Sequence, residues 1–206
     1  MKTVYNKNDK AIILKDELGK GGEGTIYSVD TKTVAKIYHT KSLTPEKEGK
    51  IKALIAKKIR LEGICAPIES LFDERGHFVG YLMPKANAES GFELQTCVFN
   101  PALLKLKLAD WDRINLANLS ISILEKIKLL HENDIIIGDI NPFNILIKDD
   151  KTVYFVDVDS YQVDNYPCPV GTVHFTAPEI QNVDSFNKLI RTKEHEYFAV
   201  ATLLFM

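Results

Sequence analysis

The chain has 206 residues, 45% of them hydrophobic, which is enough to bury one core or two small ones. Its formal net charge of −2 excludes a chain that binds nucleic acid or anionic lipid through overall charge. Cys65, Cys97 and Cys168 lie far apart, which predicts free thiols in a reducing compartment rather than disulfides or a zinc site. No apolar run reaches the roughly 20 residues of a membrane-spanning helix. We therefore expect a cytoplasmic protein that associates with neither membrane nor nucleic acid.

The first half of the chain has the pattern of strands. Residues 11–38 alternate between apolar and polar side chains, with breaks at a glycine-rich run and at residues 30–32. The sequence Thr-Pro-Glu at residues 44–46 predicts the start of a helix, whose apolar positions continue to Ile59. Residues 66–83 predict two further strands joined by a turn.

A polar connector at residues 84–91 separates this half from one of different character. Residues 111–131 have the apolar spacing of a long amphipathic helix. Two short strands are predicted at residues 144–147 and 153–156, and an apolar helical segment follows at residues 197–206. Strands dominate before the connector and helices after it, which predicts an α+β fold in two lobes.

A glycine-rich run lies between two predicted strands. Gly19, Gly21 and Gly24 match G-x-G-x-x-G, a spacing that lets a hairpin tip lie close over phosphates with its N–H groups directed at them. A dinucleotide-binding fingerprint requires a helix directly after the glycines, so that interpretation is disfavoured. By itself the match is also explained by an ordinary turn. The predicted phosphate-binding turn comprises Gly19, Lys20, Gly21, Gly22, Glu23 and Gly24.

Lys36 lies twelve residues after Gly24, in the next predicted strand. A lysine at this place can contact the α- and β-phosphates of ATP if a carboxylate holds it, although most strand lysines are simply solvated. Glu48 is our first choice for that carboxylate, because it shares a helical face with the apolar Ile51. Glu46 is the alternative.

Three polar residues follow at a spacing typical of phosphoryl transfer. Asp139 and Asn144 are five residues apart, and Asp157 lies thirteen residues after Asn144. Asp139 would orient the acceptor hydroxyl, while Asn144 and Asp157 would supply oxygen ligands to Mg²⁺. Asp159 adds a further metal ligand. Asp–Asn pairs also cap ordinary turns, but the order of the glycine run, the lysine and these residues favours an ATP-dependent transferase.

Together with Gly171 to Glu179, which contains Ala-Pro-Glu, these motifs resemble the eukaryotic-type protein kinase superfamily over residues 11–206. Within it, residues 80–85, 138–141 and 157–160 resemble a divergent bacterial branch. The resemblance implies a serine/threonine protein kinase that uses ATP and Mg²⁺ and phosphorylates a protein hydroxyl. It implies a β-rich N-lobe and hinge at residues 1–86, and a helical C-lobe at residues 87–206 that ends early in its αF-type helix.

The resemblance also implies individual roles. Asp139 would be the catalytic aspartate, and Thr172 would brace it in the platform that receives the peptide acceptor; a threonine there favours Ser/Thr acceptors over Tyr. The residues implied to contact adenine are Ile26, Val34 and Leu146 on its faces, Met83 as the gatekeeper, and Pro84, Lys85 and Ala86 in the hinge.

The activation loop departs from the superfamily pattern. Ile137 and Gly138 stand where a histidine and an arginine are usual, and that arginine normally contacts a phosphorylated residue of the loop. Residues 160–170 contain one serine, Ser160, and no threonine. We therefore expect any activity to be independent of phosphorylation in this loop.

Other departures concern catalysis and the end of the chain. Asn141 stands where a lysine normally contacts the γ-phosphate; a unit charge at about 4 Å is worth on the order of 4 kcal/mol at an effective dielectric of 20, so catalysis is expected to be weak. Glu196 stands where an aspartate anchors the catalytic loop, and Arg191 is a candidate partner for Glu179. Because the family's large lobe continues through further helices, we expect another chain or a missing C-terminal segment to cover residues 197–206.

Two other functions remain open. Asn141 and the early end favour a nucleotide-binding pseudokinase that acts as a scaffold. The Asp139, Asn144 and Asp157 spacing also resembles aminoglycoside- and choline-type small-molecule kinases, which generally lack the Ala-Pro-Glu platform. The basic residues between Lys47 and Arg60 are expected to be the solvated face of a helix rather than a nucleic-acid site.

Overall fold

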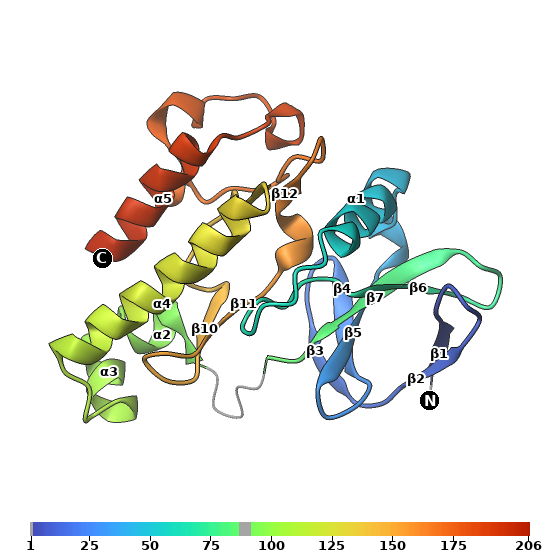
Figure 1. Ribbon diagram of the computed structural model, residues 1–206, viewed down its shortest axis with the longest axis horizontal. Helices are drawn as coiled ribbons and strands as arrows, with labels where there is room; N and C mark the ends of the chain where they lie inside the picture. The colour runs from blue at the N-terminus through green and yellow to red at the C-terminus, as the bar shows by residue number, and fades with distance from the viewer. Residues whose placement is uncertain (1, 87–91) are drawn as a thin grey trace. The chain divides into compact units, whose positions relative to one another are not determined.

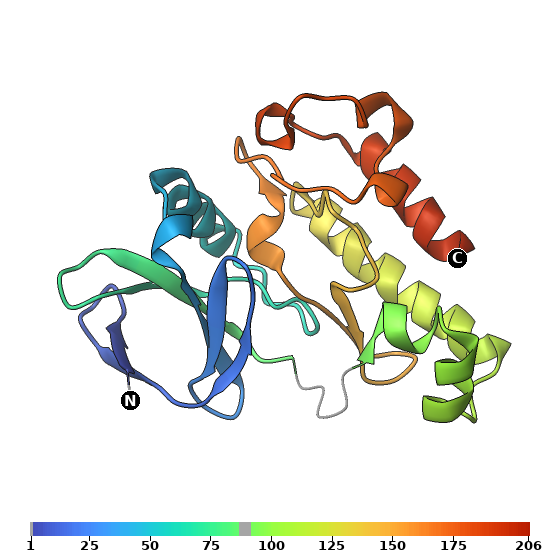
Figure 2. The same cartoon turned by 180° about the vertical axis from the view of Figure 1, so that it is seen from behind.

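The computed structural model describes residues 2–86 and 92–206. The chain divides into two compact units, the first formed by Met1–Arg60 with Cys65–Lys85 and the second by Leu61–Ile64 with Ala86–Met206. Figures 1 and 2 show a large sheet in the first unit and most of the helices in the second. This confirms the predicted α+β class, with a β-rich first half and a helix-rich second half. Among the described residues, no helix has both the length and the apolar character that crossing a membrane requires.

Within the described residues, the first unit contains an antiparallel sheet in the order β2-β1-β6-β7-β5-β4-β3. The strands are β1 (Lys2–Tyr5), β2 (Ala11–Leu14), β3 (Glu17–Lys20), β4 (Gly24–Ser28), β5 (Thr33–Tyr38), β6 (Glu69–Phe72) and β7 (Phe78–Pro84). The turns predicted at the glycine-rich run and at residues 30–32 both join neighbouring strands. Strand β1 was not predicted, because its four residues are too few to show a clear alternation.

The two faces of this sheet differ in character. Neighbouring residues of a strand point to opposite faces, and residues paired across strands share a face. Ala35, Ile37 and Leu82 belong to a buried hydrophobic cluster with residues of β1, β2 and β6. Val34 and Lys36 alternate with the first two of these, so they lie on the opposite face of β5.

Helix α1 (Pro45–Ala56) begins where the sequence predicts it. The Thr44 side chain accepts a hydrogen bond from Lys47 N at 3.1 Å, which caps the first turn, and Pro45 occupies the first helical position. The expected continuation to Ile59 is wrong, because Lys58 adopts a left-handed φ of 52° just after the helix ends. The basic residues are not a uniformly solvated face either, since Lys50 is buried.

The second unit is built around helices and short strands. Its elements are β8 (Phe92–Glu93), α2 (Leu94–Cys97), α3 (Pro101–Lys107), α4 (Arg113–Glu132), β9 (Ile135–Ile136), β10 (Ile145–Ile147), β11 (Val153–Phe155), β12 (Gln162–Val163) and α5 (Lys193–Phe205). Single 3₁₀ turns occur at Val158–Ser160, Val173–Phe175, Pro178–Ile180 and Phe186–Lys188. Strands β11, β10 and β8 form one small sheet, and β12 pairs with β9. The helices and strands predicted at residues 111–131, 144–147, 153–156 and 197–206 are all present.

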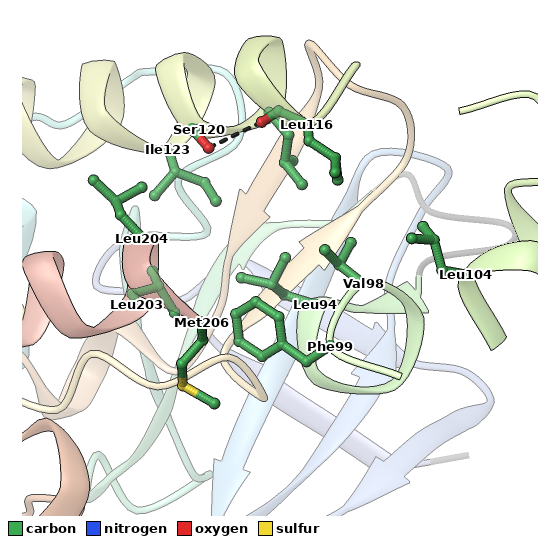
Figure 3. A pocket seen from close by; sticks show the side chains of 11 residues that line it. Leu94, Val98, Phe99, Leu104, Leu116, Ser120, Ile123, Leu203, Leu204 and Met206 are labelled. Atoms are coloured by element: carbon green, nitrogen blue, oxygen red, sulfur yellow. Dashed lines mark hydrogen bonds between the residues drawn. The ribbon is translucent and has the colours of Figure 1, made fainter. Parts of the chain in front are cut away.

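Helices α4 and α5 lie side by side in both views (Figures 1 and 2). An apolar cavity of about 200 Å³ is lined by α2, α3, α4 and the end of α5, and Figure 3 shows Leu94, Phe99 and Met206 among the side chains around it. A second cavity of about 480 Å³ lies between α4 and α5. Neither contains a residue from the predicted functional site.

Candidate active site

In the first unit, the predicted nucleotide-contacting residues share one face of the sheet. Ile26 pairs with Lys36 between β4 and β5, and Val34 pairs with Met83 between β5 and β7. Paired residues share a face, so these four side chains lie opposite the hydrophobic cluster. Lys36 is only 7% exposed, so it is not the solvated strand lysine considered as the ordinary alternative.

The glycine-rich run forms the tip of the β3–β4 hairpin. Gly21 N donates to Gly24 O at 2.9 Å, which closes the turn. A Cβ placed on Gly19 or Gly22 would meet no atom within 4 Å, so there is open space beside the backbone of the turn. A Cβ on Gly24 would lie 2.6 Å from Ile37 O, so that position requires glycine for the approach of β4 to β5. This geometry is the one expected of a glycine-rich turn that lies over phosphates, and ordinary hairpin turns have it as well.

An ion pair that the sequence analysis missed joins this turn to α1. Glu23 Oε2 lies 2.7 Å from Lys47 Nζ, and the Lys47 ammonium lies 5.1 Å from the centre of the Tyr38 ring. Glu48 lies on the same helix and forms an ion pair with Lys52 at 2.7 Å. The proposed contact between Glu48 and Lys36 therefore stays a prediction.

The predicted hinge begins at the end of β7. Pro84 pairs with Thr33, and Lys85 N donates to Lys32 O at 2.8 Å. Ala86 is assigned to the second unit, and the connector predicted at residues 84–91 lies partly outside the described residues.

In the second unit, both carboxylate oxygens of Asp139 accept hydrogen bonds. Thr172 Oγ1 donates to Oδ1 at 2.8 Å, and Asn141 Nδ2 donates to Oδ2 at 3.0 Å. Asn141 Oδ1 in turn accepts from Phe143 N at 3.0 Å. Asn141 was considered only as the replacement of a lysine, whereas its amide hydrogen-bonds to the Asp139 carboxylate and orients it.

A buried carboxylate holds the backbone just before Asp139. Glu196 Oε1 accepts from Ile137 N at 2.8 Å and from Gly138 N at 3.4 Å, as expected for the residue that anchors the catalytic loop. His131 Nε2 lies 2.9 Å from Glu196 Oε2, and both side chains are buried. His131 shares the buried face of α4 with Ile127, one helical turn earlier, and that spacing was the available signal for a buried role.

The predicted metal ligands lie at one end of the β10–β11 hairpin. Asn144 O accepts a hydrogen bond from Val156 N at 3.0 Å, and Asp157 is the residue directly after Val156. This hydrogen bond therefore brings the backbone of Asp157 close to Asn144. Asp157 adopts a left-handed φ of 59°, and Asp159 is buried in the next turn. Carboxylate and amide oxygens are ligands that Mg²⁺ accepts, so these residues fit a magnesium ion. Across residues 2–86 and 92–206, no group of three or more His, Cys, Asp or Glu side chains forms a metal site by itself.

The suggested pairing of Arg191 with Glu179 is wrong. Within the described part of the chain, the Arg191 guanidinium donates to the carbonyl oxygens of Cys168 and Val170, while Glu179 is exposed. Nothing in the sequence spacing indicated these carbonyl partners.

Comparison with known proteins identifies two kinds of similarity. The model of the RIO domain, a protein-kinase-like domain, matches residues 98–194, which include Asp139, Asn144 and Asp157. The proteins named "Protein kinase YegI" of Escherichia coli O157:H7 and of Escherichia coli strain K12 are each 32% identical to the chain over 98% of its length. The chain spans about a third of the length of these curated relatives, 32% of each.

The similarity extends over both units, and it agrees with the two-part α+β fold and with the order of the motifs. The chain is a divergent member of the protein-kinase-like superfamily.

Proposed function

We propose that the protein transfers the γ-phosphate of ATP to a serine or threonine hydroxyl of a protein acceptor. The observation that carries this proposal is the Asp139 carboxylate, which accepts hydrogen bonds from Thr172 at 2.8 Å and from Asn141 at 3.0 Å in a loop anchored by Glu196. A carboxylate held on both oxygens has a defined direction before any acceptor binds, as base and orienting groups in catalysis require.

Each remaining group has one proposed task. Asp139 accepts the proton of the acceptor hydroxyl and aligns its oxygen. Asn144, Asp157 and Asp159 would hold Mg²⁺, which would neutralise charge on the phosphates. Lys36, held by Glu48, contacts the α- and β-phosphates beneath the glycine turn. Adenine contacts are proposed for Ile26, Val34, Leu146, Met83, Pro84, Lys85 and Ala86.

The three buried free thiols support a reducing, cytoplasmic location as part of the proposal. The protein acceptor is proposed from the name of the relatives and from Thr172, which contacts the catalytic carboxylate from the segment that precedes Ala-Pro-Glu.

The test is transfer of radiolabelled phosphate from ATP to protein and to small-molecule acceptors, with phosphoamino-acid analysis of the product. Asp157→Ala should reduce turnover on the order of 1,000-fold, because the metal supplies several kcal/mol of charge stabilisation. Asp110→Ala, an exposed residue before α4, is the matched control and should retain activity. Equal transfer by wild type and Asp157→Ala would refute the proposal, and label on aminoglycoside or choline alone would reassign the acceptor.

A nucleotide-binding pseudokinase is the second candidate, and Asn141 favours it. The amide of Asn141 bonds to Asp139 and to Phe143 N, and it carries no charge for the γ-phosphate. Calorimetry would then detect binding of ATP with Mg²⁺, while the transfer assay would show no Asp157-dependent product.

A further inference from the structure

Arg191 is a buried cation in the segment before α5, held by both its backbone and its side chain. Its side chain and backbone together are 4% exposed. Arg191 N donates to Gln162 Oε1 at 2.7 Å, and Gln162 Nε2 donates to Arg191 O at 2.8 Å. The guanidinium lies 4.4 Å from the centre of the Phe186 ring, a distance typical of a cation–π contact.

The hydrogen bonds of the guanidinium lead to the segment that precedes Thr172. Nη1 donates to Cys168 O at 3.3 Å, and Nη2 donates to Val170 O at 2.7 Å. Two donors on one rigid, planar group therefore set the path of three consecutive residues.

The same group contacts two glycines that flank the Asp139–Thr172 hydrogen bond. A Cβ on Gly138, directly before Asp139, would lie 2.5 Å from Arg191 Nη1. A Cβ on Gly171, directly before Thr172, would lie 2.9 Å from Nη2. The guanidinium thus occupies the side-chain space of the glycine immediately before each partner of the 2.8 Å bond between Thr172 Oγ1 and Asp139 Oδ1.

Packing alone does not account for a charged residue at this place. Within the described residues, the guanidinium bonds carbonyl oxygens and no carboxylate, and burying a charge without an ion-pair partner is unfavourable. A cavity of about 10 Å³, room for about one water molecule, is lined by Arg191, Gly138 and Glu196. Gly138 N donates to Glu196 Oε1 at 3.4 Å, and the Arg191 guanidinium occupies the space where a side chain on Gly138 would lie.

We propose that Arg191 is a positioning residue that holds residues 168–172 against Gly138, so that Thr172 bonds Asp139 without modification of this segment. Residues 160–170 contain one serine and no threonine, so a permanent cation replaces the switchable contact between an arginine and a phosphorylated loop. The effect on catalysis rests on the proposed kinase function, whereas the effect on the structure does not.

The test compares Arg191→Met and Arg191→Lys with Thr172→Val, which removes the hydrogen bond directly, and with Arg113→Met, an exposed control. The first readout is the ¹³C NMR signal of the Asp139 side-chain carboxyl. It should move in the same direction in Arg191→Met as in Thr172→Val. The second readout is hydrogen exchange, in which the amides of Cys168, Val170, Gly171 and Thr172 should exchange about tenfold faster in Arg191→Met, because the hydrogen bonds from the guanidinium that order this segment are lost.

In the transfer assay, kcat of Arg191→Met should fall on the order of 10- to 100-fold while KM for ATP stays near the wild-type value, because the acceptor side alone is misplaced. Arg191→Lys should be intermediate, since lysine keeps the charge but not the planar geometry. Arg113→Met should match the wild type in every readout.

An unchanged Asp139 signal with unchanged exchange in Arg191→Met would overturn the proposal. Faster exchange throughout α4 and α5 as well would also overturn it, because Arg191 would then act on global stability alone. A changed signal and localised exchange in a protein that transfers no phosphate would support the positioning role and refute the proposed kinase function.

Discussion

The two units hold the loops that carry the predicted site residues by side-chain contacts of similar length and very different burial. In the first unit, Lys47 contacts Glu23 of the glycine turn at 2.7 Å, and the Glu23 side chain is 53% exposed. In the second, His131 contacts Glu196 at 2.9 Å, and the Glu196 side chain is fully buried. Water and salt screen the first pair, so its net contribution is about 0–1 kcal/mol. Removal of a buried hydrogen-bonding partner leaves buried polar groups unsatisfied, which costs about 1–3 kcal/mol for each group.

The difference in burial predicts that the glycine turn changes conformation more easily than the loop that carries Asp139. A glycine turn held by a screened pair can adjust to a nucleotide at little energetic cost. The loop that carries Asp139 is anchored by Glu196 and, in our proposal, by Arg191, so the direction of the Asp139 carboxylate is set before any ligand binds. The predictions below test this difference, from the largest expected effect to the smallest.

Glu196→Ala should lower the free energy of unfolding by about 3–5 kcal/mol, because His131 and two backbone N–H groups lose their acceptor. Urea denaturation measures the change. Glu132→Ala, an exposed glutamate of α4, is the matched control and should stay within about 0.5 kcal/mol of the wild type. A loss below 1 kcal/mol for Glu196→Ala would remove the contrast between the two units.

Gly138→Ala should lower the free energy of unfolding by about 2–4 kcal/mol, combining a left-handed backbone with a steric clash. Its φ is 76°, and the new Cβ would lie 2.5 Å from Cys168 Cβ as well as from Arg191. Gly76 in the first unit has a φ of 80° and open space around a Cβ, so Gly76→Ala isolates the backbone effect at about 1–2 kcal/mol. Equal losses in the free energy of unfolding for the two variants would show that the added Cβ at Gly138 causes no steric clash.

A double-mutant cycle of Glu23→Gln and Lys47→Met should give a coupling free energy of about 0.2–1 kcal/mol in thermal or urea denaturation. The coupling should vanish at 1 M salt, where the Debye length is about 3 Å. The partly exposed Glu48–Lys52 pair provides a cycle on the same helix and should behave alike. A coupling that survives high salt would mean that the turn is held as firmly as the catalytic loop.

The smallest effect concerns the turn between β10 and β11. Asp150 Oδ2 accepts from Asn118 Nδ2 at 2.8 Å and from Asn115 Nδ2 at 2.9 Å, and these hydrogen bonds lower the pKa of the Asp150 carboxyl. A lowered folded-state pKa means stability that is present above the ordinary value of about 4 and is lost as the pH falls through the lower one. The thermal midpoint of Asp150→Ala should therefore lie below that of the wild type at pH 7, with a gap that closes at acidic pH. A gap independent of pH would show that the charge is irrelevant there, and Asp110→Ala should show no gap.

Much of the fold could be predicted because its signals are local. The cap and proline at Thr44 and Pro45 set the start of α1, and apolar spacing located α4. Strand β1 was missed, since Val4 is buried by pairing with β2 and β6 rather than by a pattern of its own. The end of α1 was misjudged because Ile59 keeps helical spacing beyond a left-handed residue.

The candidate site was only partly predictable, because only its local spacing could be seen in the sequence. Spacing in the chain indicated Asp139, Asn144 and Asp157, and family resemblance added Thr172. It did not indicate the contacts of His131 and Lys47, whose partners come from other elements, or the local hydrogen bonds of Asn141 to Asp139 and Phe143.

The sequence by itself determined the α+β class, the order of the motifs and the residue types that phosphoryl transfer needs, because each depends on neighbours within a few turns of chain. Only the tertiary structure decided which charges are buried and what they bond. Arg191 illustrates this: its carbonyl partners lie more than twenty residues earlier in the chain, and Glu196 reaches back to Gly138 across 58 residues. A hydrogen bond depends on distance and direction in space, and folding alone brings such residues together.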